Sequence, residues 1–261
     1  MTRPHFIWIL VASGSAVALE CSRSACAQPE LGTSLTLSQV RAILKAAPGH
    51  ANFAGKRIIN LDLGNLDFRG ANFNRCNLFE TTFHGANLSH ASLVDAFLSA
   101  TKFPNANLQR ARLTGATLLT TAEGANFSGA DLSRASGYLI APQGLFVRAN
   151  LSRARLRPDM TNQPMGLLHT ILSQADLTDA NLAGTDLTFA SLTSAKFIRA
   201  NLRGANFDQA DLSRANFDGA DVTDANFSKA DISQTAFTNV RGRASMRGLE
   251  LALNRDQAIF K

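Results

Sequence analysis

Large apolar residues recur at every fifth position over most of the chain. This interval differs from the 3.6-residue period of an amphipathic helix and from the two-residue alternation of a half-buried strand. Two unbroken runs of fourteen carry it, at Phe53, Ile58, Leu63, Phe68, Phe73, Leu78, Phe83, Leu88, Leu93, Leu98, Phe103, Leu108, Leu113 and Leu118, and at Leu172, Leu177, Leu182, Leu187, Leu192, Phe197, Leu202, Phe207, Leu212, Phe217, Val222, Phe227, Ile232 and Phe237. With the pairs Phe127–Leu132 and Leu151–Leu156 between the runs, the pattern has thirty-two units.

Each unit restricts two positions and leaves the others polar. The residue two places before each centre is usually Ala and the one just before it is mostly Asn or Asp, whereas the two that follow vary among polar and small residues. Two inward residues in five suit one side of a coil that turns a corner at every unit. Stacked coils would pair their backbones about 4.8 Å apart around a continuous apolar column. Asn, Asp and Gly are poor strand residues, but they accept the dihedrals of such corners.

This pattern, seen in ANLRGANFDQADLSRANF at residues 200–217, resembles the pentapeptide-repeat family, whose units read A-(D/N)-L-X-X. The resemblance covers residues 51–239. It implies an all-β solenoid, a right-handed quadrilateral β-helix with four units in each coil. Thirty-two units then imply about eight coils and a rod roughly 40 Å long.

The regular spacing is interrupted in the middle of the chain. Centres are nine residues apart from Leu118 to Phe127, one short of register, and the next two gaps are nineteen and sixteen residues. Pro and Gly in those two gaps predict loops near 137–148 and 157–170 that bulge from the rod. Such loops are either tolerated insertions or recognition loops.

Both ends of a solenoid need covers, because an open coil exposes unpaired backbone and apolar surface. We expect residues 28–50 to form an N-terminal helical cap, with a helix near 34–47 that ends at Pro48-Gly49. Its apolar face would consist of Leu37, Val40, Ile43 and Leu44. Residues 240–261 are predicted to form a C-terminal cap with a short helix at 246–260.

The first twenty-seven residues have the pattern of a secretory signal peptide. Arg3 precedes an apolar run, and Ala25-Cys26-Ala27 matches an A-x-A cleavage site. Cleavage after Ala27 predicts an exported protein, periplasmic or secreted, with no transmembrane segment left. A lipoprotein signal at Cys21 is the alternative, although Glu20 does not fit its consensus. An uncleaved anchor is less favoured because the apolar run is short.

Cleavage would change the cysteine count and the charge. Cysteine falls from three to one, so the remaining Cys76 has no partner for an internal disulfide. Its inward position in the repeat predicts a buried, inert thiol. The net charge falls from +6 to +5, because Arg3, Arg23 and Glu20 leave with the leader.

No residue set predicts catalysis, a cofactor or a metal site. A filled rod offers no pocket where titratable groups converge. His84 and His90 lie on adjacent outward sides, but no Cys or carboxylate lies at a metal-ligand spacing. Eight Asp residues precede centres and are expected to bind turn backbone rather than metal: Asp62, Asp67, Asp131, Asp176, Asp186, Asp211, Asp221 and Asp231.

Several apolar residues fall on outward positions. Ile59, Phe79 and Leu119 each follow a centre on the same side, and Phe97 precedes a centre there; we call these four residues the apolar stripe. With Tyr138 and Phe146 of the predicted loop they form the candidate interaction surface. Aligned exposed apolar residues usually become buried against something. The stripe is covered by the N-terminal helix or the middle loop, or it binds a protein, a second copy included.

Basic residues are expected on several sides, interleaved with acids: Arg69, Arg75, Arg110, Arg134, Arg153, Arg199, Arg203, Arg214 and Lys229. No aromatic residues alternate with them, so we expect no nucleic-acid partner.

The leading hypothesis is an exported, non-enzymatic rod that serves as a protein-interaction or scaffold module in the cell envelope. The alternative is an envelope or secreted factor that binds anionic polymer or lipid. Resemblance to the family also implies protection of a topoisomerase by DNA mimicry, which suits an acidic cytoplasmic rod better than a basic chain with a leader.

Overall fold

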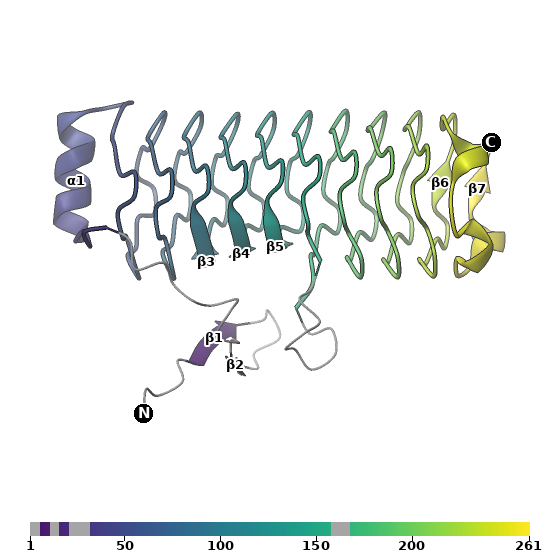
Figure 1. Cartoon of the computed structure of the whole chain (residues 1–261), viewed down its shortest axis with the longest axis horizontal. Coiled ribbons are helices and arrows are strands. Elements are labelled where there is room, and N and C mark those ends of the chain that lie inside the picture. The colour runs from purple at the N-terminus through teal and green to yellow at the C-terminus, as the bar shows by residue number, and fades with distance from the viewer. Residues whose placement is uncertain (1–5, 11–15, 21–31, 158–167) are drawn as a thin grey trace.

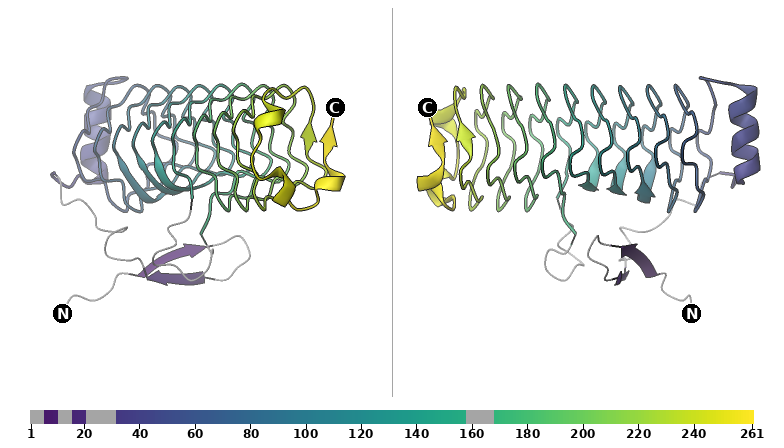
Figure 2. Two further views of the ribbon diagram at one scale, coloured as in Figure 1. Left: turned by 45° about the vertical axis from the view of Figure 1, so that its right-hand side comes forward. Right: turned by 180° about the vertical axis from the view of Figure 1, so that it is seen from behind.

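The computed structural model describes residues 6–10, 16–20, 32–157 and 168–261. From residue 51 the chain winds into stacked four-sided coils, with helix α1 (Leu37–Ala46) across one end and the C-terminus at the other (Figure 1). The coils keep one common axis when the molecule is turned (Figure 2). The predicted right-handed quadrilateral β-helix is confirmed.

Four ladders of parallel bridges join consecutive coils, one on each side, and each ladder joins ten positions of the coils. Ser34, which precedes α1, adds a parallel bridge to Arg57 at the start of ladder 2. Ladder 1 joins Asn52, Asn72, Ser92, Arg112, Asp131, Asn150, Asn181, Asn201, Asp221 and Arg241. Ladder 2 joins Arg57, Asn77, Phe97, Thr117, Ser136, Arg155, Asp186, Asn206, Asn226 and Arg247. Ladder 3 joins Asp62, Thr82, Lys102, Thr121, Ile140, Ile171, Ser191, Asp211, Asp231 and Leu253. Ladder 4 joins Asp67, Asn87, Asn107, Asn126, Leu145, Asp176, Lys196, Asn216, Ala236 and Ile259. We number the four faces of the rod after their ladders.

Local hydrogen bonds explain why five residues make one side. The backbone N–H of Phe68 donates to the carbonyl of Asn87 in the next coil at 2.7 Å, and the N–H of Ala71 donates to the carbonyl of Phe68 at 3.0 Å. The second bond closes a turn whose corner residue, Gly70, has φ +64°. Residues such as Asn65 occupy the same left-handed corner at φ 57°. Polar residues with short side chains tolerate this conformation, so the corners draw on the variable positions of the repeat.

The inward positions form one continuous column. The Ala and Leu or Phe residues of the repeat are almost completely buried. In the last coils, the rings of Phe197, Phe217 and Phe237 stack at centroid distances of 4.7 and 4.9 Å. Cys76 takes an Ala position, where its Sγ donates to the carbonyl of Lys56 at 3.0 Å. Burial raises the pKa of this thiol to about 12, so it stays protonated at neutral pH.

Two coils in the middle are one residue short. Ladder 2 and ladder 3 are five residues apart in most coils but four apart from Thr117 to Thr121 and from Ser136 to Ile140. Losing one residue straightens the corner into continuous strand, and strands β3 (Phe97–Lys102), β4 (Thr117–Thr121) and β5 (Ser136–Ile140) form a parallel sheet there.

The predicted loop at 137–148 is therefore wrong, because this segment is a regular part of the wall. Gly137 pairs with Leu118, and Ala141 and Phe146 are buried at inward positions. Gly137 and Ala141 occupy the centre positions of their units, and a search for Leu or Phe at every centre does not detect them. Ala122, Gly137, Ala141 and Phe146 raise the number of inward centres from thirty-two to thirty-six, which makes nine coils. A tenth coil follows at the C-terminus, so the rod has ten coils rather than the eight predicted.

The second interruption lies between Arg155 of ladder 2 and Ile171 of ladder 3. Residues 158–167, which hold most of the loop predicted at 157–170, lie outside the described residues.

Helix α1 caps the first coil as predicted. Thr36 begins it with a capping box, in which the N–H of Thr36 donates to Oε1 of Gln39 at 2.8 Å and the N–H of Gln39 donates to Oγ1 of Thr36 at 3.4 Å. Val40 is fully buried, and the other three residues of the predicted apolar face pack against the column.

The predicted C-terminal helix at 246–260 is wrong. Residues 241–260 instead form three one-turn 3-10 helices, at Arg243–Ser245, Leu249–Leu251 and Arg255–Gln257, and strand β7 (Ile259–Phe260), which pairs in parallel with β6 (Ala236–Phe237). Left-handed residues recur every six positions, at Gly242, Gly248 and Asn254, and prevent a continuous helix. The segment is a tenth coil with six-residue sides. It leaves Leu251, Leu253 and Ile259 exposed at the end of the rod.

Strands β1 (Phe6–Leu10) and β2 (Ala16–Glu20) pair antiparallel within the predicted leader. The predicted cleavage site at Ala27 lies outside the described residues, and so does Cys21. None of the described helices combines the length and apolar character that crossing a bilayer requires.

Candidate interaction surfaces

The apolar stripe lies on face 2, over the first half of the rod. Ile59, Phe79 and Leu119 follow ladder-2 centres, and Phe97 is itself a ladder-2 residue. Backbone hydrogen bonds confirm the alignment. The N–H of Asn60, next to Ile59, donates to the carbonyl of Phe79 in the next coil, and the N–H of Glu80, next to Phe79, donates to the carbonyl of Ser99. Ser99 in turn pairs with Leu119. All four side chains of the stripe are half-buried.

Tyr138 extends the apolar stripe, whereas Phe146 does not belong to the surface. Tyr138 pairs in register with Leu119 across β4 and β5 and is 7% exposed. Burial raises the pKa of its phenol to about 12. Phe146 is fully buried and stacks on Phe127 at 4.8 Å. Its place in the candidate surface was wrong, because the predicted loop is a coil wall.

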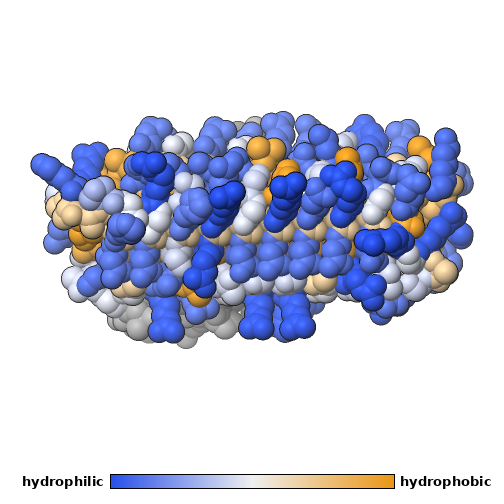
Figure 3. Space-filling view, turned by 90° about the horizontal axis from the view of Figure 1, so that it is seen from above, coloured by the Kyte–Doolittle hydropathy of each residue, from blue (hydrophilic) through white to orange (hydrophobic). Residues whose placement is uncertain are grey.

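Beyond Tyr138 the same column becomes polar. Arg157, Thr188, Asp208 and Ser228 take the position after the ladder-2 centre in the described coils that follow. On the face seen in Figure 3, hydrophobic side chains are scattered singly among hydrophilic ones. A run of aligned apolar residues as on face 2 is therefore not a general property of this rod.

The Asp residues before the centres are structural, as expected. In all eight, Oδ1 accepts a hydrogen bond from the backbone N–H two residues later, which fixes the corner. Burial by itself raises the pKa of Asp131, but hydrogen bonds from Ser133, Thr114 and Asn150 outweigh it and hold the pKa below its ordinary value. These carboxylates are thus bound to their own corners and, as in Asp131, to neighbouring coils.

His84 and His90 are not brought together at a shared site. Nδ1 of His84 lies 3.3 Å from Oδ1 of Asp62, and its Nε2 lies 3.1 Å from Nδ2 of Asn65. His90 lies in a recess elsewhere on the rod. Within the described ranges, no three His, Cys, Asp or Glu side chains gather in a way that would hold a metal ion.

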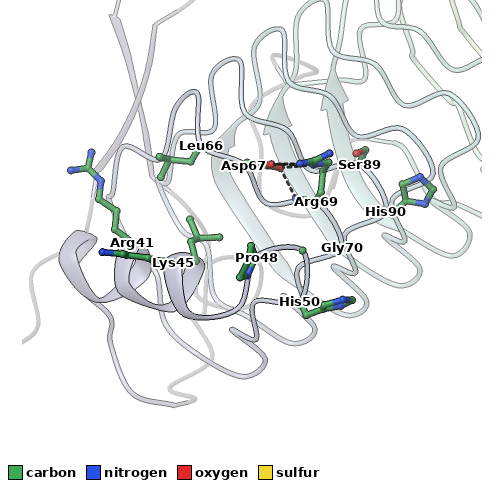
Figure 4. A pocket seen from close by; sticks show the side chains of 12 residues that line it. Arg41, Lys45, Pro48, His50, Leu66, Asp67, Arg69, Gly70, Ser89 and His90 are labelled. Carbon is green, nitrogen blue, oxygen red and sulfur yellow. Dashed lines mark hydrogen bonds and ion pairs between the residues drawn. The ribbon is translucent and has the colours of Figure 1, made fainter.

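A recess of about 690 Å³ lies where α1 meets the first coils (Figure 4). Leu44, Pro48 and Leu66 supply apolar walls. Its charged and titratable lining residues are Arg41, Lys45, His50, Asp67, Arg69 and His90. Asp67 is engaged by Arg69, whose Nη2 lies 2.8 Å from Oδ2. Arg41 and Lys45 then give the recess a positive character.

Basic residues lie on several sides of the rod, as expected, with Arg155 in ladder 2 and Arg214 at a corner after ladder 3, but arginines are most numerous on face 1 and its edges. Arg134 and Arg153 occupy corners of adjacent coils at the edge between faces 1 and 2. Arg110 and Arg148 occupy corners at the edge between faces 4 and 1, and Arg112 belongs to ladder 1. Ion pairs hold other arginines, such as Arg199, which lies on the same edge as Arg148 and contacts Asp179 at 2.8 Å.

The family model for pentapeptide repeats matches the chain in eight copies, over residues 57–93, 83–118, 170–209 and 205–241. Similar solved structures include HetL, a pentapeptide repeat protein involved in heterocyst differentiation regulation from the cyanobacterium Nostoc sp. strain PCC 7120, at 27% identity, with 87% of this chain and 100% of that chain covered and a TM-score of 0.45. They also include QnrB1, a plasmid-mediated fluoroquinolone resistance protein, at 18% identity, with 76% and 99% covered and a TM-score of 0.45. A search of curated protein sequences found no match. The five-residue pattern, the four ladders and the matched family model together show that the chain belongs to the pentapeptide-repeat family.

Proposed function

We propose that this protein is a non-enzymatic binding rod of the cell envelope, exported by its N-terminal leader, which holds a partner protein against the apolar stripe on face 2. The observation that carries the proposal is the alignment of Ile59, Phe79, Leu119 and Tyr138 in one column of a filled rod, in which Ser99 is the one polar position between them. Outward positions do not build the column, so folding does not require them to be apolar. Aligned apolar residues at such positions favour an interface.

The rest of the described surface supports binding rather than chemistry. The Asp side chains before the centres are committed to their own corners, and Cys76 is a buried, protonated thiol. Pentapeptide-repeat proteins are in general structural or interaction modules. A DNA-mimicking role is not proposed, because the chain carries a net charge of +6 whereas duplex DNA is densely anionic.

Charged substitutions in the stripe test the proposal. In the double variant Phe79→Asp, Leu119→Asp we expect the fold to persist and capture of the partner to fall about tenfold or more, because two carboxylates would be desolvated in the interface. The measurement is quantitative capture from an envelope extract on immobilised protein, at low and at raised salt. A hydrophobic interface should resist salt.

A matched control places the same charges on face 4. Val147 and Ile198 occupy the equivalent position after ladder-4 centres and are also half-buried, so the control is the double variant Val147→Asp, Ile198→Asp. This variant should capture the partner as the parent does. Equal capture by the stripe variant and the parent would remove the basis for the stripe as an interface.

Export makes a separate prediction. We expect the protein purified from its own host to begin at Gln28, since the A-x-A site ends at Ala27. Intact mass and N-terminal sequencing of the periplasmic and medium fractions provide the check. A chain that retains Met1 in the cytosol would contradict the envelope location. A chain that begins at a lipid-modified Cys21 would show that the leader is a lipoprotein signal rather than one cleaved after Ala27.

A further inference from the structure

Six exposed arginines cluster on the middle coils, on face 1, its edges and the adjoining ladder 2, and none of their guanidinium groups has a salt-bridge or hydrogen-bond partner among the described residues: Arg110, Arg112, Arg134, Arg148, Arg153 and Arg155. Arg155 lies one step beyond the edge, on face 2. Asp179 interacts electrostatically with Arg148, but its carboxylate is bound by Arg199 at 2.8 Å. Guanidinium groups without partners are open to anionic ligands, which they bind with paired, directional hydrogen bonds.

The arginines form two rails along the rod. On one edge, Arg134 and Arg153 are in consecutive coils, since the N–H of Arg134 donates to the carbonyl of Ser152. On the other edge, Arg110 and Arg148 are two coils apart, about 10 Å at the spacing of stacked strands. Gly129 lies between them and leaves room for the Arg110 side chain, whose Cγ is 3.3 Å from the position that a Cβ on Gly129 would take.

The floor between the rails is polar. It consists of short hydroxyl and amide side chains, among them Thr114, Ser133, Asn150 and Ser152. Asp131 also lies in the floor, but its oxygens already accept hydrogen bonds from Thr114, Ser133 and Asn150 at 2.9 to 3.0 Å. No aromatic side chain occupies an outward position on the described part of face 1.

We propose that face 1 binds a linear acidic polysaccharide along the rod, with its carboxylates on the arginine rails and its hydroxyl groups on the polar floor. Short Ser, Thr and Asn side chains offer both donors and acceptors to sugar hydroxyls. Single-stranded nucleic acid would need aromatic side chains for its bases to stack on, and the described part of face 1 has none. A bilayer surface is favoured by basic residues beside apolar anchors, which this floor also lacks.

The recess at α1 extends the basic surface toward one end of the rod. His90 occupies the same edge as Arg110, one coil earlier, because its N–H donates to the carbonyl of Gln109. Arg41 and Lys45 of α1 line the recess beyond it. The edge therefore continues from Arg148 through Arg110 and the polar His90 to the basic residues of the cap, which is long enough for several sugar units.

The test compares two quadruple variants of the full mature chain, with polygalacturonate as the probe. The first removes the rails: Arg110→Gln, Arg134→Gln, Arg148→Gln and Arg153→Gln. The second removes the same charge from other sides: Lys102→Gln, Lys196→Gln, Arg214→Gln and Lys229→Gln. Gln is compatible with these corners, since Gln143, Gln174, Gln209 and Gln234 already hold φ between 54° and 61°. Thermal melting confirms that both variants fold.

We expect the rail variant to bind polygalacturonate about tenfold more weakly or worse at low ionic strength, and the control to stay within about threefold of the parent. Binding by the parent should weaken as salt is added. The proposal is overturned if both variants lose affinity equally, if the parent does not bind polygalacturonate, or if it binds duplex DNA or phosphatidylglycerol vesicles more tightly. The stripe variant Phe79→Asp, Leu119→Asp should keep polysaccharide binding, which separates this site from the proposed protein interface.

Discussion

Replacing Phe217 with Ala should lower the free energy of unfolding by about 3–5 kcal/mol, the usual cost of deleting a buried phenyl ring from a core that cannot collapse around the gap. Phe217 is fully buried and stacks between Phe197 and Phe237, while the rings of Phe207 and Phe227 contact it edge-on at 5.9 Å. Backbone ladders on four sides hold the wall in place, so the cavity would persist. Urea unfolding monitored by circular dichroism measures the change.

Phe189→Ala is the matched control, because Phe189 lies at a corner and is only half-buried. We expect it to cost about 1 kcal/mol or less, in line with most substitutions outside a core. Coils contact only their neighbours, so hydrogen exchange in Phe217→Ala should speed up mainly in the coils around ladder-4 position Asn216. A loss of similar size in both variants would mean that the column does not dominate stability.

The regular part of the fold could be predicted because the residue types within each unit determine which positions are buried and which form the corner. Ala205 and Phe207 are fully buried, and Asn206 before the centre joins ladder 2. Its Oδ1 accepts from the N–H of Asp208, the corner bond expected from its residue type. The same three roles recur in every coil, so local preference and tertiary contact agree.

The irregular parts could not be predicted because a small residue can fill an inward position when neighbouring coils supply the volume. Gly137 and Ala141 take such positions, where a pattern of large residues fails. The last coil escaped detection for another reason. Its period is six residues, with Gly242 and Gly248 at left-handed corners, whereas its Leu residues suggested a helix.

The alignment of charged residues along the rod could not be predicted, for a physical reason tied to those short coils. A twenty-residue repeat places Arg134 and Arg153 in different columns, but the coil between ladder-1 positions Asp131 and Asn150 has nineteen residues. The missing residue aligns the two arginines on one edge. Tyr138 joins Leu119 in the apolar stripe for the same reason. Surface sites of a solenoid therefore depend on register, which only the inter-coil bridges reveal.

Gly137→Ala should cost at least about 3 kcal/mol, because backbone strain and overpacking act at the same residue. Gly137 has φ +116°, and a Cβ there would lie 1.8 Å from the carbonyl oxygen of Leu118. The obstacle is backbone, which cannot rotate away as a side chain can. Relief requires β4 and β5 to separate, and these strands join the coils that hold Arg112 and Arg134. We therefore expect a lower midpoint of urea unfolding and weaker binding of polygalacturonate.

Gly204→Ala isolates the clash from the change of residue type. Gly204 lies at a corner with φ +62°, and the place that a Cβ would take there has no neighbouring atom within 4 Å. Non-glycine residues such as Arg199 and Gln209 hold similar corners at φ 53° and 57°. The added methyl group also reduces the entropy of the unfolded chain, which offsets part of the left-handed strain. We expect a loss of about 1 kcal/mol or less and unchanged polysaccharide binding. If Gly137→Ala were equally mild, the close approach of β4 and β5 would not constrain the rod, and the nineteen-residue coils would owe their register to the side chains of the column instead.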